Sequence, residues 1–346
     1  MVSSILQSKF ANKSLNQSQP PLHEKIWYGR HPIATLLTPL AFLFRALIAL
    51  RKAAYRNGLI SDYKADVPVI VIGNLTVGGT GKTPLVIWVV HYLRELGFKP
   101  GIISRGYRGR AKSWPQQVRA DSDPAMVGDE AIVIARRTGC PIAVGPKRAD
   151  SVRALLQHSD CDIVVSDDGL QHYKLRRDVE ILVIDGIRRF GNGRCLPAGP
   201  LREPPSRAKE VDLTVVNGIP DRGEFQMKTV VGKVYSLNDS SHSVSIETFY
   251  GKAVNAVAGI GNPDRFFDML KSKGLRVEKH RFGDHHVFSA RDFIFDTELP
   301  ILMTEKDAVK CAHFRLKDAW YLPIDIEMPA VFGHRLSSTL KEARDG

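Results

Sequence analysis

The feature that most constrains the fold is a glycine-rich turn directly after a short apolar run. The run covers residues 67–72 (VPVIVI) and the turn covers residues 73–83 (GNLTVGGTGKT), where a helical stretch begins. Glycines let backbone N–H groups point inward around phosphate oxygens, and the N-terminus of the next helix adds partial positive charge. A strand, this turn and a helix in that order predict a phosphate-binding loop within an α/β sheet.

The end of the turn supplies two side chains for nucleotide chemistry. Lys82 is expected to reach the β- and γ-phosphates, and the Thr83 hydroxyl to bind Mg²⁺. Thr76 replaces the first glycine of the usual GxxxxGK[ST] pattern, but enough glycines remain for the cradle, so a turn without nucleotide is the less favoured alternative. The nearest guanine-specificity candidate, residues 304–307 (TEKD), has the wrong spacing, and ATP is favoured. The residues expected to bind ATP are Thr76, Val77, Gly78, Gly79, Thr80, Gly81, Lys82 and Thr83.

Beyond the turn, short Val- and Ile-rich runs alternate with helical stretches. Continuous apolar strands are typical of strands buried on both faces of a parallel sheet that helices cover. Strands are expected at residues 100–104, 141–144, 162–166, 180–184 and 212–216, and helices at residues 82–96 and 126–137. A Gly- and Pro-rich stretch at residues 186–205 is too long for an ordinary connection and indicates a functional loop.

The fold class predicted from this alternation is α/β. We expect a P-loop NTPase-like, mostly parallel sheet with helices on both faces, and a smaller α/β second domain. The predicted limits are 1–57 for a polar lead-in and a membrane-associating helix, 58–225 for the P-loop core, and 226–346 for a C-terminal domain that closes over the cleft.

The net positive charge of the chain indicates an anionic partner. Lys and Arg total 49 against 37 Asp and Glu, which gives a net charge of +12 over 346 residues. Nucleic acid, phospholipid and a phosphorylated substrate all fit this balance, as does a basic protein with no special partner. No recognisable nucleic-acid-binding module is present, so no nucleic-acid partner is expected. The four scattered cysteines do not predict a disulfide framework or structural zinc, and they favour a reducing compartment.

The N-terminal region contains an apolar stretch at residues 33–50 (IATLLTPLAFLFRALIAL). Arg45 interrupts this stretch, and Arg51, Lys52 and Arg56 follow it. Its uncharged part is shorter than the roughly 20 apolar residues that cross a hydrocarbon core. A helix at the membrane interface, whose basic residues reach lipid phosphates, is favoured over a helix buried against the protein and over a transmembrane span.

Carboxylates at strand ends are the second requirement of phosphoryl transfer, because they hold Mg²⁺ and orient the accepting group. Asp167 and Asp168 follow the apolar run 162–166, and because successive strand side chains point to opposite faces, the two are expected to divide the work. An Asp that only caps the next turn is the alternative. Asp129 and Glu130 begin a predicted helix, where carboxylates also occur simply because they complement the helix dipole.

One further group of side chains stands in the second region. Asp284, His285 and His286 are consecutive, and they can assist a general base, bind a metal or lie on the surface. Adjacent histidines do not share a helix or strand face, so a two-histidine metal site is not expected.

Together these segments resemble the tetraacyldisaccharide 4′-kinases, membrane-associated P-loop kinases of lipid A biosynthesis. The motifs occur in family order over about residues 27–325 and are highly specific as a set; Leu170, where Phe is expected, and Gly283, where Pro is common, are minor departures. The matching motifs are GNLTVGGTGKTP (73–84), SRGYRGR (104–110), VGDEA (127–131), SDDGLQH (166–172), LPAGPLREP (196–204), FGDHH (282–286) and TEKDAVK (304–310).

The resemblance implies an ATP- and Mg²⁺-dependent lipid kinase. It would phosphorylate the 4′-hydroxyl of a tetraacyl glucosamine disaccharide 1-phosphate to form lipid IVA, at the cytoplasmic face of a Gram-negative inner membrane. The implied catalytic residues are Asp129 as base, His285 as the group that orients or tunes it, and Lys82. The implied metal-side residues are Thr83, Glu130, Asp167 and Asp168. The residues implied for the lipid substrate are Asn74, Arg105, Tyr107 and His172.

A nucleotide-driven switch or maturation ATPase or GTPase is the second hypothesis, because its GGTGKT turn can look similar. The missing guanine motif and the loop at residues 196–204 count against it.

Overall fold

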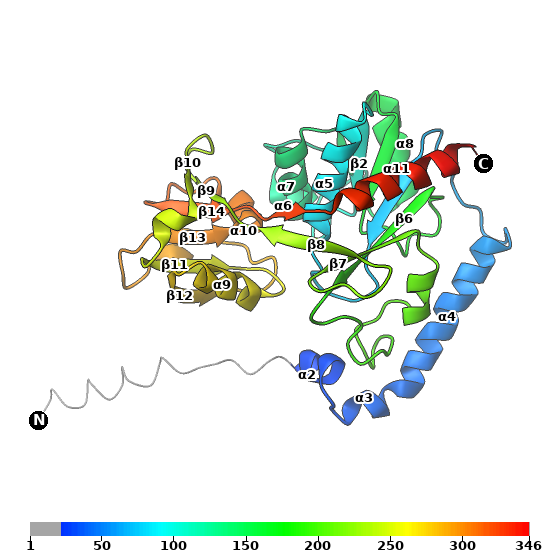
Figure 1. Ribbon diagram of the computed structural model, residues 1–346, viewed down its shortest axis with the longest axis horizontal. Coiled ribbons are helices and arrows are strands. Elements are labelled where there is room, and N and C mark those ends of the chain that lie inside the picture. Colours follow the sequence, from blue (N-terminus) through cyan, green and yellow to red (C-terminus); the bar gives the residue numbers. More distant parts are fainter. Residues whose placement is uncertain (1–21, 346) are drawn as a thin grey trace, which may run out of the picture.

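The structure is a computed structural model, and it describes residues 22–345. Figure 1 shows two lobes side by side, with the N-terminal helices standing along the larger one. Of the predicted polar lead-in, residues 1–21 lie outside the described residues, and the described part of the chain begins with helix α2 (Leu22–Tyr28).

The larger lobe is built on a nine-stranded sheet. Its strands are β1 (Val69–Gly73), β2 (Pro100–Ser104), β3 (Gln116–Val118), β4 (Ile142–Val144), β5 (Ile163–Asp167), β6 (Val179–Asp185), β7 (Leu213–Asn217), β8 (Phe225–Val230) and β15 (Asp325–Glu327). They lie in the order β15-β8-β7-β6-β1-β5-β2-β4-β3, and every neighbouring pair is parallel except at the two edges, β15–β8 and β3–β4. The predicted mostly parallel sheet is therefore confirmed.

Helices cover both faces of this sheet, as its continuous apolar strands predict. They are α5 (Lys82–Glu95), α6 (Pro124–Val127), α7 (Asp129–Thr138), α8 (Arg148–His158) and α11 (Ala330–Asp345). In β1, Ile70 and Ile72 join a core with α5, α7 and α11, whereas Val69 and Val71 join a second core with α8. This alternation follows from the period of two along a strand and explains why the strands have no polar face.

The helix predicted for residues 126–137 is two helices. Helix α6 ends at Val127, and Gly128 has a φ of 90° before α7 begins at Asp129. A Cβ at Gly128 would lie 2.7 Å from the carbonyl oxygen of Tyr107, so the close approach of that loop requires glycine. The break places Asp129 at the first position of α7.

The smaller lobe has a six-stranded sheet in the order β10-β9-β14-β13-β11-β12. The strands are β9 (Lys233–Ser236), β10 (Ser243–Ser245), β11 (Ala253–Ala258), β12 (Arg276–Arg281), β13 (Ile301–Thr304) and β14 (Ala319–Leu322). Helix α9 (Pro263–Ser272) packs in the core on one face, and α10 (Glu305–Cys311) in the core on the other. This lobe is the predicted smaller α/β unit.

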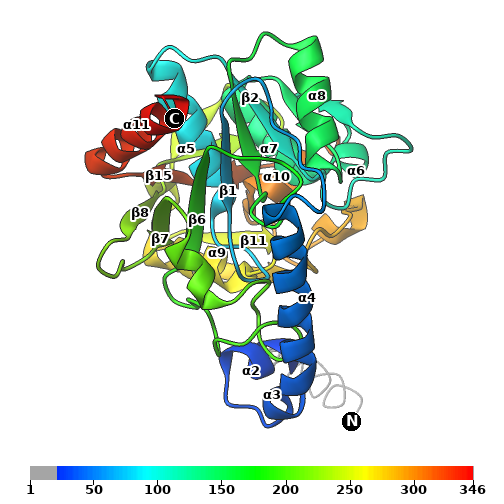
Figure 2. The same cartoon turned by 90° about the vertical axis from the view of Figure 1, so that its right-hand side faces the viewer.

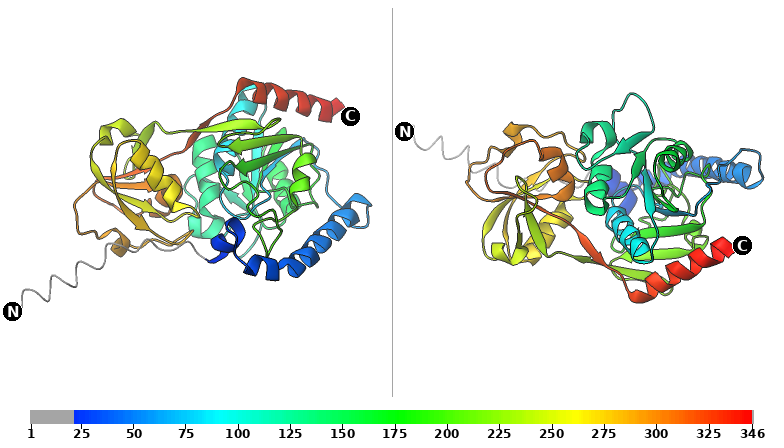
Figure 3. Two further views of the ribbon diagram at one scale, coloured as in Figure 1. Left: turned by 60° about the horizontal axis from the view of Figure 1, so that its bottom comes forward. Right: turned by 90° about the horizontal axis from the view of Figure 1, so that it is seen from above.

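The chain crosses between the lobes twice, after β8 and after β14. Although the sequence prediction assigned residues 226–346 to the second domain, most of β8, all of β15 and α11 belong to the larger lobe. Figure 3 shows α11 lying along that lobe from two directions. The physical reason is that Phe332, Leu336 and Leu340 of α11 are buried in the core of the larger sheet.

The predicted apolar stretch forms two helices, α3 (Ile33–Leu36) and α4 (Thr38–Arg56), which Figure 2 shows extending beyond the body of the protein. Within α4 only Ala41 is buried, so the alternative of a helix buried against the protein is wrong. Four leucines in one stripe of α4 are more than half exposed: Leu40, Leu43, Leu47 and Leu50. None of the helices in residues 22–345 is long and apolar enough to cross a membrane.

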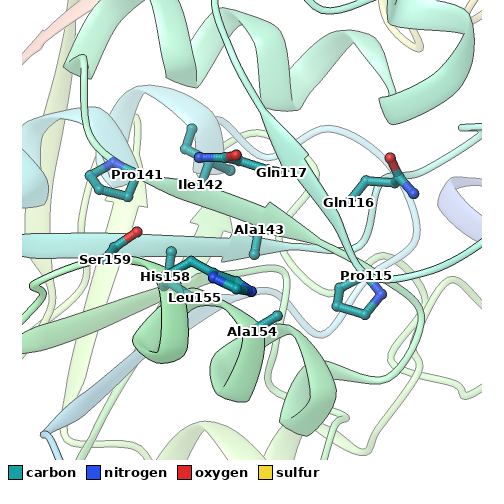
Figure 4. Close-up of a pocket in the computed structure, with 10 residues that line it drawn as sticks. All are labelled: Pro115, Gln116, Gln117, Pro141, Ile142, Ala143, Ala154, Leu155, His158 and Ser159. Atoms are coloured by element: carbon teal, nitrogen blue, oxygen red, sulfur yellow. The ribbon is translucent and has the colours of Figure 1, made fainter.

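One cavity of about 310 Å³ lies between β3, β4 and α8 (Figure 4). Its wall is largely apolar, with Gln116, Gln117 and His158 among the lining residues. None of the residues predicted for the site lines it.

Candidate functional site

The phosphate-binding turn lies between β1 and α5, as the sequence predicts. Gly78 has a φ of 114° and Gly81 a φ of 92°, in a region that favours glycine. A Cβ at Gly81 would lie 2.7 Å from Nδ2 of Asn217, so the turn sits tightly on the end of β7. Val77 donates a backbone hydrogen bond to the carbonyl oxygen of Pro200 at 2.8 Å. The long loop at residues 186–205 therefore braces the turn.

Lys82 is the first residue of α5, and its ammonium group is held by two oxygens. Nζ donates to Oδ1 of Asn74 at 2.9 Å and lies 3.4 Å from Oδ1 of Asp168. Arg202 donates to both carboxylate oxygens of Asp168, at 3.1 and 3.2 Å. The four side chains come from three segments, the turn, the end of β5 and the long loop, so this cluster joins parts of the chain that are far apart in sequence.

The two strand-end aspartates have opposite electrostatic surroundings. Burial raises the pKa of Asp167 to about 7, and the negative charge of Glu130 adds to this effect. Burial also disfavours the charged form of Asp168, but the positive charges of Lys82 and Arg202 outweigh it and hold its pKa well below the usual range. Oδ1 of Asp167 is buried and has no hydrogen-bond partner.

Arg148 is a buried arginine at this site that the sequence analysis did not single out. Its guanidinium donates to the backbone oxygens of Asp167 and Asp168, both at 3.3 Å, and to that of Gly145 at 2.7 Å. Burial lowers its pKa to about 10, so it stays charged at neutral pH. The signal in the sequence that could have identified Arg148 is its positive charge at the start of a helix, where the helix dipole favours an acidic residue.

The second cluster joins the two lobes through Asp129 and His285. Oδ2 of Asp129 lies 2.9 Å from Nδ1 of His285, and Nζ of Lys310 lies 3.9 Å from the same oxygen. Less than a tenth of the side chain of either Asp129 or His285 is exposed. Burial disfavours the charged form of Asp129, but the His285 hydrogen bond and the charges of Lys306 and Lys310 outweigh it and lower its pKa.

The candidate acceptor residues lie around these two clusters. The ring of Tyr107 meets that of His285 edge-on, with 5.2 Å between centroids, and the guanidinium of Arg105 lies 5.8 Å from the Tyr107 ring. Burial and the charge of Arg148 lower the pKa of His172 to about 4, so its imidazole is neutral at physiological pH. The fourth candidate, Asn74, is buried in the Lys82 cluster and belongs with the turn.

Two cavities are lined by residues at the start of α7. One, of about 240 Å³, is lined by residues 79–83 of the turn, by Glu130 and by residues of the smaller lobe. The other, of about 480 Å³, is lined by Asp129, His285 and Tyr107. Since Asp129 and Glu130 are consecutive, the predicted catalytic pair and the phosphate-binding turn are brought to neighbouring cavities. Within residues 22–345 there is no cluster of three His, Cys, Asp or Glu side chains with metal-binding geometry.

Comparison with known proteins decides the family. The family model described as "Tetraacyldisaccharide-1-P 4'-kinase" matches residues 33–341. The chain belongs to this 4′-kinase family. A tetraacyldisaccharide 4′-kinase of Nitrosococcus oceani is 52% identical over 92% of this chain and 94% of the relative, and one of Aeromonas salmonicida is 48% identical over 89% and 93%.

The 4′-kinase fold is also shared with a solved structure. LpxK from Aquifex aeolicus, in a crystal structure with ATP, superposes with a TM-score of 0.76 at 25% identity, over 89% of this chain and 99% of that chain. The predicted P-loop-type α/β fold is thereby confirmed. Sequence reasoning did not single out three arginines of the site. Arg148 donates to backbone oxygens, and the side-chain partners of Arg202 and of Arg265, which lines the cavity of the turn, are distant in sequence.

Proposed function

We propose that this 4′-kinase transfers the γ-phosphate of ATP to the 4′-hydroxyl of a tetraacyl glucosamine disaccharide 1-phosphate. The observation that carries the proposal is the junction at Asp129 and Glu130, where a phosphate-binding turn and an Asp–His pair from two lobes meet. A sugar hydroxyl is a weak nucleophile, so the site must act by positioning, proton removal and neutralisation of phosphate charge. These three tasks fall to different parts of the site.

The turn at residues 76–83 would bind the phosphates of ATP. Its backbone N–H groups and the N-terminus of α5 supply a cradle, and Lys82 supplies the full positive charge. Asp168 and Asn74 hold the Lys82 ammonium in place before nucleotide arrives. Arg202 is a second cation beside Asp168, so this carboxylate stays paired when Lys82 contacts the phosphates.

Mg²⁺ would be held by oxygen donors from the turn, α7 and β5. Thr83 and Glu130 line the cavity of the turn, and Asp167 lies close enough to Glu130 for their charges to interact. Mg²⁺ prefers such oxygen ligands and takes the remainder from water and phosphates. The unpartnered Oδ1 of Asp167 fits a cation, whereas Asp168 is already paired and supports the site from Lys82. Bound Mg²⁺ would supply positive charge that neutralises the phosphates.

His285 would remove the proton from the acceptor hydroxyl, and Asp129 would position His285. Because the pKa of Asp129 is lowered, its carboxylate stays ionised and accepts the Nδ1–H of His285. That hydrogen bond fixes the tautomer and leaves Nε2 as the basic nitrogen. This assignment exchanges the roles that the family resemblance implied, in which Asp129 was the base.

The lipid acceptor is expected to approach from the side of Arg105 and Tyr107, with its acyl chains toward the N-terminal helices. The exposed leucines of α4 and the basic residues Arg45 and Arg51 suit a membrane interface. Lys52 is engaged with Glu210 and serves to attach α4 to the body of the protein. We place the enzyme at the cytoplasmic face of the inner membrane, where ATP and a lipid disaccharide meet.

The test is transfer of radiolabel from γ-labelled ATP to a defined lipid disaccharide in detergent micelles. We expect the label in the lipid, and a loss of about a thousandfold or more in Lys82→Ala, since a principal charge on the phosphates is removed. Lys317→Ala, at an exposed lysine of the smaller lobe, is the matched control. Label released only as inorganic phosphate would instead identify a nucleotide-driven switch.

A further inference from the structure

Lys306 brings a positive charge from the smaller lobe into the cavity of the phosphate-binding turn. Its Nζ lies 2.6 Å from Oε1 of Glu130, and about a quarter of the side chain is exposed. The cavity has residues 79–83 on one wall and Lys306 on the wall formed by the smaller lobe. In the function proposed above, this lysine acts only through its charge near Asp129 and has no contact with the nucleotide.

The backbone that carries Lys306 is firmly fixed. Asp307, which is fully buried, accepts hydrogen bonds from the backbone N–H of Gly259 at 2.9 Å and from Oγ1 of Thr304 at 2.7 Å. Glu305 forms an ion pair with Arg137 of the larger lobe at 3.1 Å. The start of α10 is therefore tied both to its own sheet and to α7, and the lysine is presented to the cavity from a rigid base.

The other cations of the cavity have different partners. Lys82 comes from the turn itself. Arg265 donates to Oδ1 of Asn217 at 2.7 Å and lies 3.4 Å from Asp185, so it is tied to the ends of β6 and β7. The partner of Lys306 is Glu130, a residue that we expect to be needed by Mg²⁺. Of these three cations, Lys306 is the one whose partner the bound metal would take.

We propose that Lys306 is a second phosphate-site cation, which contacts the terminal phosphate of a nucleoside triphosphate bound to the turn. The inference rests on the proposed function and assigns this site a further residue. Lys82 and Lys306 would hold the same phosphate from the two lobes, so that the triphosphate itself draws the lobes together. Because the contact is to the terminal phosphate, Lys306 would favour ATP over ADP.

The test measures nucleotide binding rather than turnover. ATP and ADP affinities of the full chain are determined by calorimetry with Mg²⁺, and again in EDTA without metal. In Lys306→Met we expect ATP affinity to fall about tenfold or more, the size of a lost charge-assisted contact, and ADP affinity to stay within about twofold. An unchanged ratio of ATP to ADP affinity in this variant would overturn the proposal.

Three further variants separate the phosphate contact from a plain ion pair. Glu130→Gln removes the partner of Lys306 but leaves the cation, so it should keep or increase metal-free ATP affinity; if Lys306 only paired with Glu130, both variants would weaken ATP binding alike. Lys306→Arg keeps the charge and should recover part of the ATP preference. Lys317→Met, at an exposed lysine, should match the wild type.

The same preparations distinguish failure of this inference from failure of the proposed function. If the wild type transfers label to the lipid and Lys306→Met binds ATP normally, only the role of Lys306 is wrong. If the wild type transfers no label to the lipid, the proposed acceptor is wrong, whatever the ratio of ATP to ADP affinity in Lys306→Met.

Discussion

At the scale of single residues, the site depends on backbone conformations that few side chains adopt easily. Asp168 has a φ of 50° and His285 a φ of 59°, both in the left-handed region, at a cost on the order of 1 kcal/mol or more for a residue other than glycine. Each is held there by its surroundings: Asp168 by Lys82 and Arg202, and His285 by Asp129. Such strain persists where it aims a functional side chain.

Asp129→Asn tests whether the carboxylate positions and polarises His285. An amide cannot stabilise the imidazolium that forms when His285 takes a proton, so kcat should fall about a hundredfold or more while the ATP affinity changes little. The folded-state pKa of Asp129 is lowered, so its carboxylate stays ionised at every pH above its ordinary value of 3.8. Asp129 itself therefore keeps its charge between pH 6.5 and pH 8.5, and the loss is measured at both values as steady-state transfer to the lipid.

A matched control for this variant is Asp150→Asn. Asp150 also lies in the first turn of a helix, α8, and lines neither cavity of the site. Its activity should equal that of the wild type. A loss in Asp129→Asn no larger than in this control would reduce Asp129 to a helix-capping residue.

The sequence was informative at this scale where the site residues are contiguous. The turn at residues 76–83 and the pair Asp167–Asp168 could be identified because their residues are neighbours in sequence, and the order of residue types alone indicates phosphate or metal binding. The contact between Asp129 and His285 spans 156 positions and was suggested only by family resemblance. Arg148 was missed because its partners are backbone oxygens, which leave no signature in residue types.

At the scale of elements, the parallel strands were predictable because burial on both faces leaves continuous Val and Ile runs. The observed β1, β2, β5 and β6 lie within two residues of the predicted ranges. The break between α6 and α7 was not predicted, since the helical pattern continues through Gly128 and only the approach of Tyr107 explains it. The orientation of α4 likewise depends on tertiary contacts that hydrophobicity cannot reveal.

The leucine stripe of α4 is the element-scale test of membrane association. Leu43→Gln with Leu47→Gln removes two exposed leucines and keeps residues that form helices well. Each buried leucine contributes about 1.5–3 kcal/mol when fully removed from water, so even partial insertion predicts a loss of about tenfold or more in binding to anionic vesicles. Sedimentation with vesicles measures it.

The control for the stripe is an equally simple change elsewhere. Leu96→Gln alters an exposed leucine just after α5, away from α4, and should leave vesicle binding unchanged. Vesicle binding of the double variant equal to that of the wild type would show that α4 is not the membrane contact, and would direct attention to another basic surface of the chain.

At the scale of the whole molecule, the two lobes are not successive pieces of the chain. The chain leaves the larger sheet after β8 and returns at β15, so two segments of the backbone connect the lobes. Elsewhere, side chains such as Arg108 make contacts between the lobes. This arrangement suits a closing motion, because both connections lie on one side of the sheet order, at its β15–β8 edge. A prediction from sequence order alone divides the chain at one point and so misses the return.

Because the chain returns to the larger lobe, helix α11 packs there and stabilises that lobe. Phe332 of α11 is fully buried, with ring centroids 5.5 Å from Trp88 and 5.3 Å from Phe225. Phe332→Ala should therefore lower the free energy of unfolding by about 3–5 kcal/mol, measured by urea denaturation. Val331→Ala, at the exposed neighbouring residue, should cost far less. Equal losses in the two variants would mean that α11 does not hold the larger lobe together.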